Sequence, residues 1–395
     1  MKIVVTEAMP TQCAEASTTE ASIPQVVLIT GAKSQLAQAL LRIAANIGEL
    51  ALNSIANTST NTSMPLELYA LSRSQLDITD AANIAAVFDQ YRPSWVLNCA
   101  AYNAVDAAEH DAIEAHRVNA LGPELLAQQC LLSGARLLHV SSDYVFGGQA
   151  VCEIAHAAKR VVGYVRESSV EQHQNPDSAS NPNPNPNPNP NPNPNQVHLP
   201  RPFVELDAPK PLSAYGQSKL LGEQRVVAVL GEDAAIVRTS WLYGQDGHNF
   251  VKTMLNLMRT QPSLQVIADQ IGCPTWSDAL AQVIWQLVVQ QCSGVFHYSA
   301  QGLCSWYEFA CEIQRQALAL NLLSLPVVIL PITSAHYAKQ ALNRGVGLAK
   351  RPSYSVLNSG KLRSTLVTNN TQSIPNNVEW QDWRQQLNCM LRRLS

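Results

Sequence analysis

The sequence predicts an α/β protein built on a doubly wound parallel sheet, with a smaller lobe toward the C-terminus. Two observations support this fold class. Short apolar runs alternate with longer helical stretches from residue 26 to residue 238, which is typical of a parallel sheet. The chain has 395 residues, of which 46% are hydrophobic and 14% are charged, so it has enough apolar material for a large buried core.

The predicted elements follow from these runs. Strands are expected at residues 26–30, 66–71, 95–98, 136–140 and 235–238. Helices are expected between them, at residues 34–47, 80–91, 111–133 and 214–230. After Trp241 the elements become shorter and mixed, with helices at 250–258, from Asp278 and from Ser305, and strands at 264–267 and 294–298. This change predicts that the smaller lobe starts at residue 241 and covers the carboxyl edge of the sheet.

Two segments are expected to lie outside the sheet domain. Residues 1–24 turn polar after a four-residue apolar run, so we expect a flexible extension and not a secretory signal. Residues 149–200 contain seven consecutive Asn-Pro pairs, and proline removes backbone donors and disfavours helix before it. They are predicted to be a low-complexity insertion, extended or disordered, with a recognition sequence for a partner as the alternative. The polar stretch 53–63 is expected to be a surface loop.

These segments divide the chain into predicted parts. The sheet domain comprises residues 25–148 and 201–240, and residues 241–395 form mainly the smaller lobe.

Composition excludes several functional classes. The net charge of −3 is too near neutral for a nucleic-acid-binding surface spread over the molecule. No apolar run reaches the roughly 18 residues that a membrane-spanning helix requires. The nine cysteines are odd in number and include no Cys-x-x-Cys pair, which favours reduced thiols in the cytoplasm and argues against a zinc site.

The first predicted strand runs into a turn at Gly31. A dinucleotide-binding fold has a Gly-x-x-Gly-x-x-Gly turn here, which lets the backbone approach a pyrophosphate at the start of the helix. Only the first glycine is present, because Ser34 and Ala37 stand at the other two positions. Ser34 still offers a backbone N–H and a hydroxyl. The alternative interpretation is an ordinary strand-to-helix turn.

The second predicted strand ends at Ser72 and Arg73, where such folds contact the adenine ribose of the cofactor. An acidic residue there would favour NAD, whereas a hydroxyl and a guanidinium suit a 2'-phosphate. The pair therefore predicts a preference for NADPH. A solvated surface arginine is the alternative.

Three residues predict proton-transfer chemistry. Tyr215 and Lys219 form a Tyr-x-x-x-Lys pattern, which places both on one face of a predicted helix. An ammonium nearby lowers the pKa of a phenol, so Tyr215 is expected to exchange a proton with a substrate oxygen. Ser142 ends the fourth predicted strand, where its hydroxyl can bond a substrate carbonyl. A polar strand end capped by its own side chains is the alternative.

Several motifs in the expected order resemble the extended short-chain dehydrogenase/reductases, which have a Rossmann-type fold, and within them the dTDP-4-dehydrorhamnose reductases. The resemblance covers most of the chain outside residues 1–24 and 149–200. It rests on residues 76–80 (LDITD), 98–109 (NCAAYNAVDAAE), 118–120 (VNA), 142–146 (SDYVF), 215–223 (YGQSKLLGE), 238–244 (RTSWLYG), 269–275 (DQIGCPT), 305–310 (SWYEFA) and 351–352 (RP).

The resemblance implies roles at the matching positions. The pyrophosphate would lie against Ser34, Gln35 and Leu36. The adenine would lie near Asp77 and Ile78, and the nicotinamide half beside Ala101, Tyr102 and Asn103. The residues implied to hold the sugar nucleotide are Ser142, Asp143 and Trp241. Tyr215 would donate the proton, and Lys219 would bond the nicotinamide ribose and bias the Tyr215 pKa.

The implied reaction is NADPH-dependent reduction of the 4-keto group of dTDP-4-dehydro-6-deoxy-L-mannose to dTDP-L-rhamnose, a donor for cell-envelope polysaccharide such as lipopolysaccharide. NADH is an alternative reductant. The resemblance also implies a homodimer and a magnesium ion whose ligands cannot be assigned. Two rival functions remain: a reductase or epimerase of another nucleotide sugar, and a non-catalytic regulatory subunit of the same fold.

Overall fold

The computed structural model describes residues 2–4, 25–52, 66–147, 200–368 and 380–395. The chain divides into two compact units, one comprising Met1–Gly148 with Pro202–Ser395 and the other Gln149–Arg201. The expected insertion at 149–200 and the expected loop at 53–63 lie outside the described residues, except for Pro200. The fold described below is that of the first unit.

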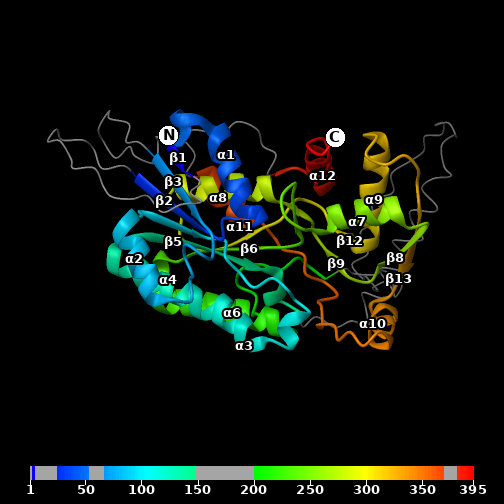
Figure 1. The fold of residues 1–395 in the computed structure, drawn as a ribbon, viewed down its shortest axis with the longest axis horizontal. Helices are drawn as coiled ribbons and strands as arrows, with labels where there is room; N and C mark the ends of the chain where they lie inside the picture. The colour runs from blue at the N-terminus through cyan, green and yellow to red at the C-terminus, as the bar shows by residue number, and fades with distance from the viewer. Residues whose placement is uncertain (1, 5–24, 53–65, 148–199, 369–379) are drawn as a thin grey trace, which may run out of the picture. The chain divides into compact units, whose positions relative to one another are not determined.

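A seven-stranded sheet forms the centre of this unit, in the order β1-β3-β2-β4-β5-β6-β11 (Figure 1). Every pairing in it is parallel. Its strands are β1 (Lys2–Val4), β2 (Gln25–Thr30), β3 (Leu66–Leu71), β4 (Trp95–Asn98), β5 (Arg136–Ser142), β6 (Ala235–Thr239) and β11 (Gly294–Tyr298). The chain progresses in one direction from β2 to β3 and in the other from β4 onward. The predicted fold class, a doubly wound parallel sheet of the Rossmann type, is therefore confirmed.

Helices cover both faces of the sheet (Figure 1). One face packs against α1 (Gln35–Leu52), α8 (Ser277–Val289) and α11 (Gly360–Thr368). The other packs against α2 (Ala81–Tyr91), α4 (Gly122–Ser133) and α6 (Ala214–Leu230). Because both faces are covered, the strands are apolar along most of their length, as in β2, where Val27, Leu28 and Ile29 are fully buried.

The helix expected at residues 111–133 is interrupted. It consists of α3 (Ala112–His116), a π-helical segment at Arg117–Leu121 and α4. A π-helical turn places an extra residue in the helix and often marks a functional site.

The remaining elements are short, as expected after Trp241. Their helices are α7 (Phe250–Thr260), α9 (Trp306–Ala319), α10 (Ser334–Asn343) and α12 (Trp383–Leu391). Their strands form three two-stranded pairs: β7 (Leu242–Tyr243) with β10 (Thr275–Trp276), β9 (Ile271–Gly272) with β12 (Cys304–Ser305), and β8 (Ser263–Ile267) with β13 (Val328–Ile332).

Two predictions about the domain boundaries are wrong in part. Lys2–Val4, expected to belong to a flexible extension, pairs with β3 as the edge strand β1. Gly294–Tyr298, expected in the smaller lobe, pairs with β6 as the last strand of the main sheet. Helix α8 likewise packs on α1 beside that sheet. These placements depend on hydrogen bonding to the open edges of the sheet and on burial against its covered faces. Neither property can be read from the local pattern of apolar and polar residues.

Candidate active site

The site lies where the strand order reverses, between β2 and β4. Thr30 ends β2, and its hydroxyl donates to Asn98 Oδ1 at the end of β4 over 2.7 Å. The same hydroxyl accepts the backbone N–H of Ala100 over 3.1 Å. These bonds hold the carboxyl ends of the two strands together, the place where open α/β sheets bind their ligands.

The turn after β2 depends on Gly31. Its φ of +67° is in the left-handed region, and a Cβ there would lie 3.0 Å from the backbone of Ala100. Ser34 then starts the helix, because its hydroxyl accepts the backbone N–H of Ala37 over 3.2 Å. Ala37 is fully buried in the core, so its methyl group fits between helix and sheet. The two missing glycines thus do not prevent the strand-turn-helix arrangement that presents backbone N–H groups at the start of α1.

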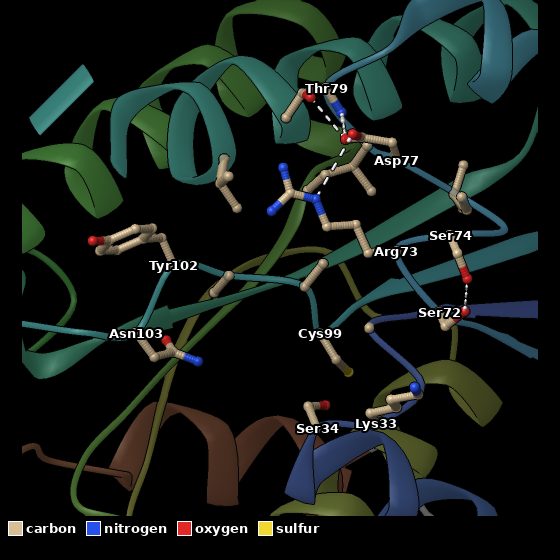
Figure 2. Close-up of a pocket in the computed structure, with 16 residues that line it drawn as sticks. Lys33, Ser34, Ser72, Arg73, Ser74, Asp77, Thr79, Cys99, Tyr102 and Asn103 are labelled. Atoms are coloured by element: carbon tan, nitrogen blue, oxygen red, sulfur yellow. Dashed lines mark hydrogen bonds and ion pairs between the residues drawn. The ribbon is translucent and has the colours of Figure 1, made fainter. Parts of the chain in front are cut away.

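Two cavities meet at this turn. The first has a volume of about 440 Å³ and is drawn in Figure 2. The predicted cofactor residues that line it are Gly31, Ser34, Ser72, Arg73, Asp77, Ile78, Ala101, Tyr102 and Asn103. The second has about 460 Å³ and shares several of these residues. The predicted residues that line it include Gln35, Leu36, Ser142, Asp143, Tyr215, Lys219 and Trp241.

The structure therefore brings every predicted site residue to one pair of adjoining cavities. Their roles stay predictions, and the contacts below show what each side chain can do.

Arg73 lies at the end of β3, in an acidic environment. Its side chain is 66% exposed, and its guanidinium is 3.8 Å from Asp77 and 3.3 Å from Glu114 (Figure 2 shows the Asp77 contact). Burial opposes ionisation of Asp77, but hydrogen bonds from Thr79 and the charges of Arg73 and Arg117 hold its pKa below the ordinary value. Arg73 is thus accessible from solvent and already engaged with two carboxylates.

Tyr215 and Lys219 are positioned by the first turns of α6. The hydroxyl of Ser213 caps this helix by accepting the backbone N–H of Gly216 over 3.1 Å. Lys219 is 2% exposed, and its ammonium donates to the Val140 carbonyl over 2.6 Å. Burial lowers the pKa of Lys219 to about 8.

The expected lowering of the Tyr215 pKa is wrong for this structure. Burial raises the Tyr215 pKa above the ordinary tyrosine range, and a hydrogen bond with Ser142 only partly offsets this. Tyr215 is therefore held as a neutral phenol, which is the form that donates a proton.

Ser142 and Asp143 lie where β5 ends and line the second cavity. The Ser142 hydroxyl donates to Asp143 Oδ1 over 3.0 Å and accepts the backbone N–H of Tyr144 over 3.2 Å. The Tyr144 ring meets the Tyr215 ring edge to face, with 5.4 Å between centroids. The Tyr215 side chain, which extends from α6, is thus held against the residues at the end of β5.

Trp241 lines the second cavity. Its φ of +45° is rare for a bulky residue, and its ring stacks on Trp306 with 3.5 Å between centroids and 7° between planes. Gly272 lies directly behind the ring, because a Cβ there would come within 2.5 Å of the indole. Trp306 also lines this cavity.

The family model described as "RmlD substrate binding domain" matches residues 25–161 and 197–395 of the chain. The chain belongs to this family. It is 31% identical to a dTDP-4-dehydrorhamnose reductase of Aggregatibacter actinomycetemcomitans, covering 85% of this chain and 92% of that protein. It is 30% identical to a dTDP-4-keto-6-deoxy-D-glucose reductase of Streptomyces niveus, covering 86% and 91%.

The structure is similar to that of a dTDP-4-dehydrorhamnose reductase from Bacillus anthracis str. Ames in complex with NADP. The TM-score is 0.66 with 27% identity, covering 94% of this chain and all of that one. At the level of the RmlD family, these findings confirm the predicted resemblance and the predicted enzyme class, an NAD(P)H-dependent reductase.

Sequence reasoning gave no role to three side chains that organise this RmlD-family site. Asn119, in the π-helical segment, accepts the Tyr102 backbone N–H over 2.8 Å and donates to the Ser218 hydroxyl over 3.0 Å. Arg351 donates to both carboxylate oxygens of Asp106, over 2.8 and 2.7 Å. Asn119, Arg351 and Trp306 all lie in motifs that carried the resemblance, and that membership was the only signal available for them.

Two further observations concern the part of the chain that the structure describes. None of its helices is both long and apolar enough to cross a membrane. It contains no cluster of three or more His, Cys, Asp or Glu side chains arranged to hold a metal ion.

Proposed function

We propose that the protein is an NADPH-dependent reductase of the 4-keto group of dTDP-4-dehydro-6-deoxy-L-mannose, with dTDP-L-rhamnose as the product. The observation that carries this proposal is the lining of the second cavity. Tyr215, Lys219 and Ser142 share that cavity with the start of α1, so a proton donor, a cation and a hydroxyl face the cofactor side of the site.

The residues present fit a dinucleotide. The left-handed turn at Gly31 packs closely on Ala100, and the start of α1 after this turn offers N–H groups to a pyrophosphate. Ser72 and Arg73 would hold the adenosine end, and Ala101, Tyr102 and Asn103 would line the nicotinamide half. The bound cofactor supplies the hydride to the substrate carbonyl carbon.

The preference for NADPH is part of the proposal. It is supported by the exposed guanidinium of Arg73 at the end of β3, since arginine binds a phosphate bidentately. The NADP complex of the Bacillus anthracis relative is consistent with it.

The chain's own residues perform the proton chemistry. Ser142 bonds the carbonyl oxygen and orients it, and Tyr215 donates its phenolic proton to that oxygen as negative charge develops there. Lys219, whose ammonium is held at the Val140 carbonyl, would bond the ribose of the cofactor. Trp241, which lines the second cavity, would contact the sugar nucleotide.

NADPH oxidation tests this function. The purified protein is mixed with the dTDP-linked 4-keto sugar, generated in situ, and the fall in absorbance is followed with NADPH and in parallel with NADH. Turnover that yields dTDP-L-rhamnose, faster with NADPH, is the expected result. The absence of turnover by folded protein that binds NADPH would contradict the substrate assignment.

A second candidate is the reduction of a different nucleotide sugar. The Streptomyces niveus relative, named for a dTDP-4-keto-6-deoxy-D-glucose substrate, is nearly as similar to this chain as the one from Aggregatibacter actinomycetemcomitans. Because the Tyr/Lys chemistry is shared, pocket contacts alone select the sugar. A panel of dTDP- and UDP-linked 4-keto sugars separates the two candidates. A regulatory subunit without catalysis would turn over none of them.

A further inference from the structure

Asp143 is an unusual carboxyl group within the candidate site. It is the first residue after β5, it is 1% exposed, and it lines the same cavity as Tyr215. Its Oδ1 accepts the Ser142 hydroxyl over 3.0 Å, and Ser355 also hydrogen-bonds the carboxyl group. A buried carboxylate that is not paired with a cation is costly to keep ionised, which favours the form that holds a proton.

No cation compensates Asp143 directly. Asp77 and Asp106 each contact an arginine, whereas the described structure shows no ion pair to Asp143. Three titratable groups near it, Tyr144, Tyr215 and Cys273, bear a negative charge when ionised. Two cations lie in the surroundings and are bonded elsewhere: Lys219, which lines the same cavity, donates to the Val140 carbonyl, and Arg351 is bonded to Asp106 and to the Tyr144 hydroxyl.

The Asp143 pKa reflects this environment. Burial raises it to about 6, although hydrogen bonds from Ser355 and Ser142 oppose the shift by favouring the ionised form. The carboxyl group therefore exchanges its proton close to neutral pH.

Asp143 connects to the proton donor through one hydroxyl group. Ser142 bonds both Asp143 and Tyr215, and it carries a single proton. When Asp143 is ionised, that proton is donated to the carboxylate. When Asp143 is protonated, the carboxyl group can donate to Ser142. The Ser142 proton is then free to bond the substrate oxygen and, once that oxygen has taken the Tyr215 proton, to turn toward Tyr215.

We propose that Asp143 is the proton reservoir of the site and recharges Tyr215 through Ser142. After Tyr215 has given its proton to the substrate oxygen, the tyrosinate takes the Ser142 proton and Ser142 takes the Asp143 proton. One O–H bond forms and one breaks at each hydroxyl, and the carboxylate is left to regain a proton from solvent. This role rests on the proposed reduction and differs from the substrate contact predicted for Asp143.

The raised Tyr215 pKa is consistent with such a relay. A strongly basic tyrosinate in a buried site is unstable, so a proton source within hydrogen-bond reach shortens its lifetime. Asp143 thus acts through Ser142 and Tyr215 as a positioning and proton-supplying residue.

The decisive experiment compares the pH profiles of the wild type, D143N and S355A in the NADPH oxidation assay. Wild-type kcat is expected to fall as pH rises through about 6, because the protonated carboxyl group is lost. D143N, which has nearly the same shape and cannot release a proton, should have a kcat lower by about tenfold and a flat profile, with little change in KM.

S355A is the matched variant, because it retains the carboxyl group. Loss of the Ser355 hydrogen bond removes support for the ionised form, so the midpoint of the profile should move to higher pH. A D143N enzyme that keeps the wild-type midpoint, or whose only change is a raised KM, would overturn the relay and favour the substrate contact.

An infrared titration tests the carboxyl group without any substrate. The wild-type spectrum should contain a protonated carboxyl band that disappears as pH rises through about 6, and D143N should lack it. Absence of this band from folded wild-type protein overturns the relay. If the band titrates as expected while no sugar is reduced, the proposed substrate has failed and the protonation of Asp143 stands.

Discussion

The two cavities of the site are built in different ways. The first is lined by residues that follow β2, β3 and β4 directly, so Gly31, Arg73 and Tyr102 reach it within a few residues of a strand end. The second depends on contacts across the chain, such as Trp241 on Trp306 and Lys219 on the Val140 carbonyl. The carboxyl ends of the strands alone are thus sufficient to place the residues of the first cavity. The second cavity also requires several loops to fold together.

The largest expected effect is that of Tyr215→Phe, which removes the proton donor where the two cavities meet. We expect kcat to fall by about a hundredfold or more, since general acid catalysis contributes on that scale. NADPH affinity and the unfolding temperature should change little, because the phenyl ring of the variant can still pack on Tyr144. The measurement is steady-state NADPH oxidation beside a thermal melt. Near wild-type turnover by the variant would show that another group donates the proton.

Next in size is Gly31→Ala, a test of the first cavity. The left-handed φ and the 3.0 Å approach to Ala100 both oppose a methyl group, so we expect a destabilisation of about 3 kcal/mol and NADPH binding weaker by about tenfold. Tryptophan fluorescence quenching by NADPH and chemical unfolding measure the two effects.

Gly134→Ala is its control. Gly134 has a φ of +74° with open space around it, so that variant should lose only about 1 kcal/mol and bind NADPH normally. Equal cofactor affinity in the two variants would contradict the role assigned to the Gly31 turn.

Trp306→Leu tests the second cavity. Loss of the stack on Trp241 should raise KM for the dTDP-sugar by about tenfold, because aromatic stacking is worth about 1 kcal/mol or more and Trp241 would lose its support. The dissociation constant for NADPH should be unchanged, since Trp306 does not line the first cavity. A parallel loss of NADPH affinity would show that the two cavities are not separable.

The smallest effect is expected from Glu114→Gln. Removing this carboxylate frees Arg73 from one of its two acidic partners, so the ratio of NADPH to NADH turnover should rise by about twofold to fivefold. Arg73→Ala is the opposite variant and should lower the ratio. No change with either variant would mean that Arg73 is a solvated surface residue.

Sequence patterns predicted the sheet and most of the cofactor side. The strands at 66–71 and 95–98 and the helix at 214–230 have the predicted boundaries, because apolar runs between polar turns carry that information locally. The prediction that Lys219 lowers the Tyr215 pKa was wrong. Helix spacing predicts that the two residues share one face of α6, but it does not show that the Lys219 ammonium is bonded to the Val140 carbonyl.

By itself, the sequence determined the doubly wound sheet, the order of its motifs and the identity of the groups at the strand ends. Only the tertiary structure decided that Lys2–Val4 and Gly294–Tyr298 join that sheet, that Asn119 ties Tyr102 to α6, and that Asp143 is buried beside Tyr215 in one cavity. The physical reason is that sheet pairing, burial and hydrogen-bond satisfaction depend on segments far apart in the chain, whereas periodicity and turn chemistry act between neighbours.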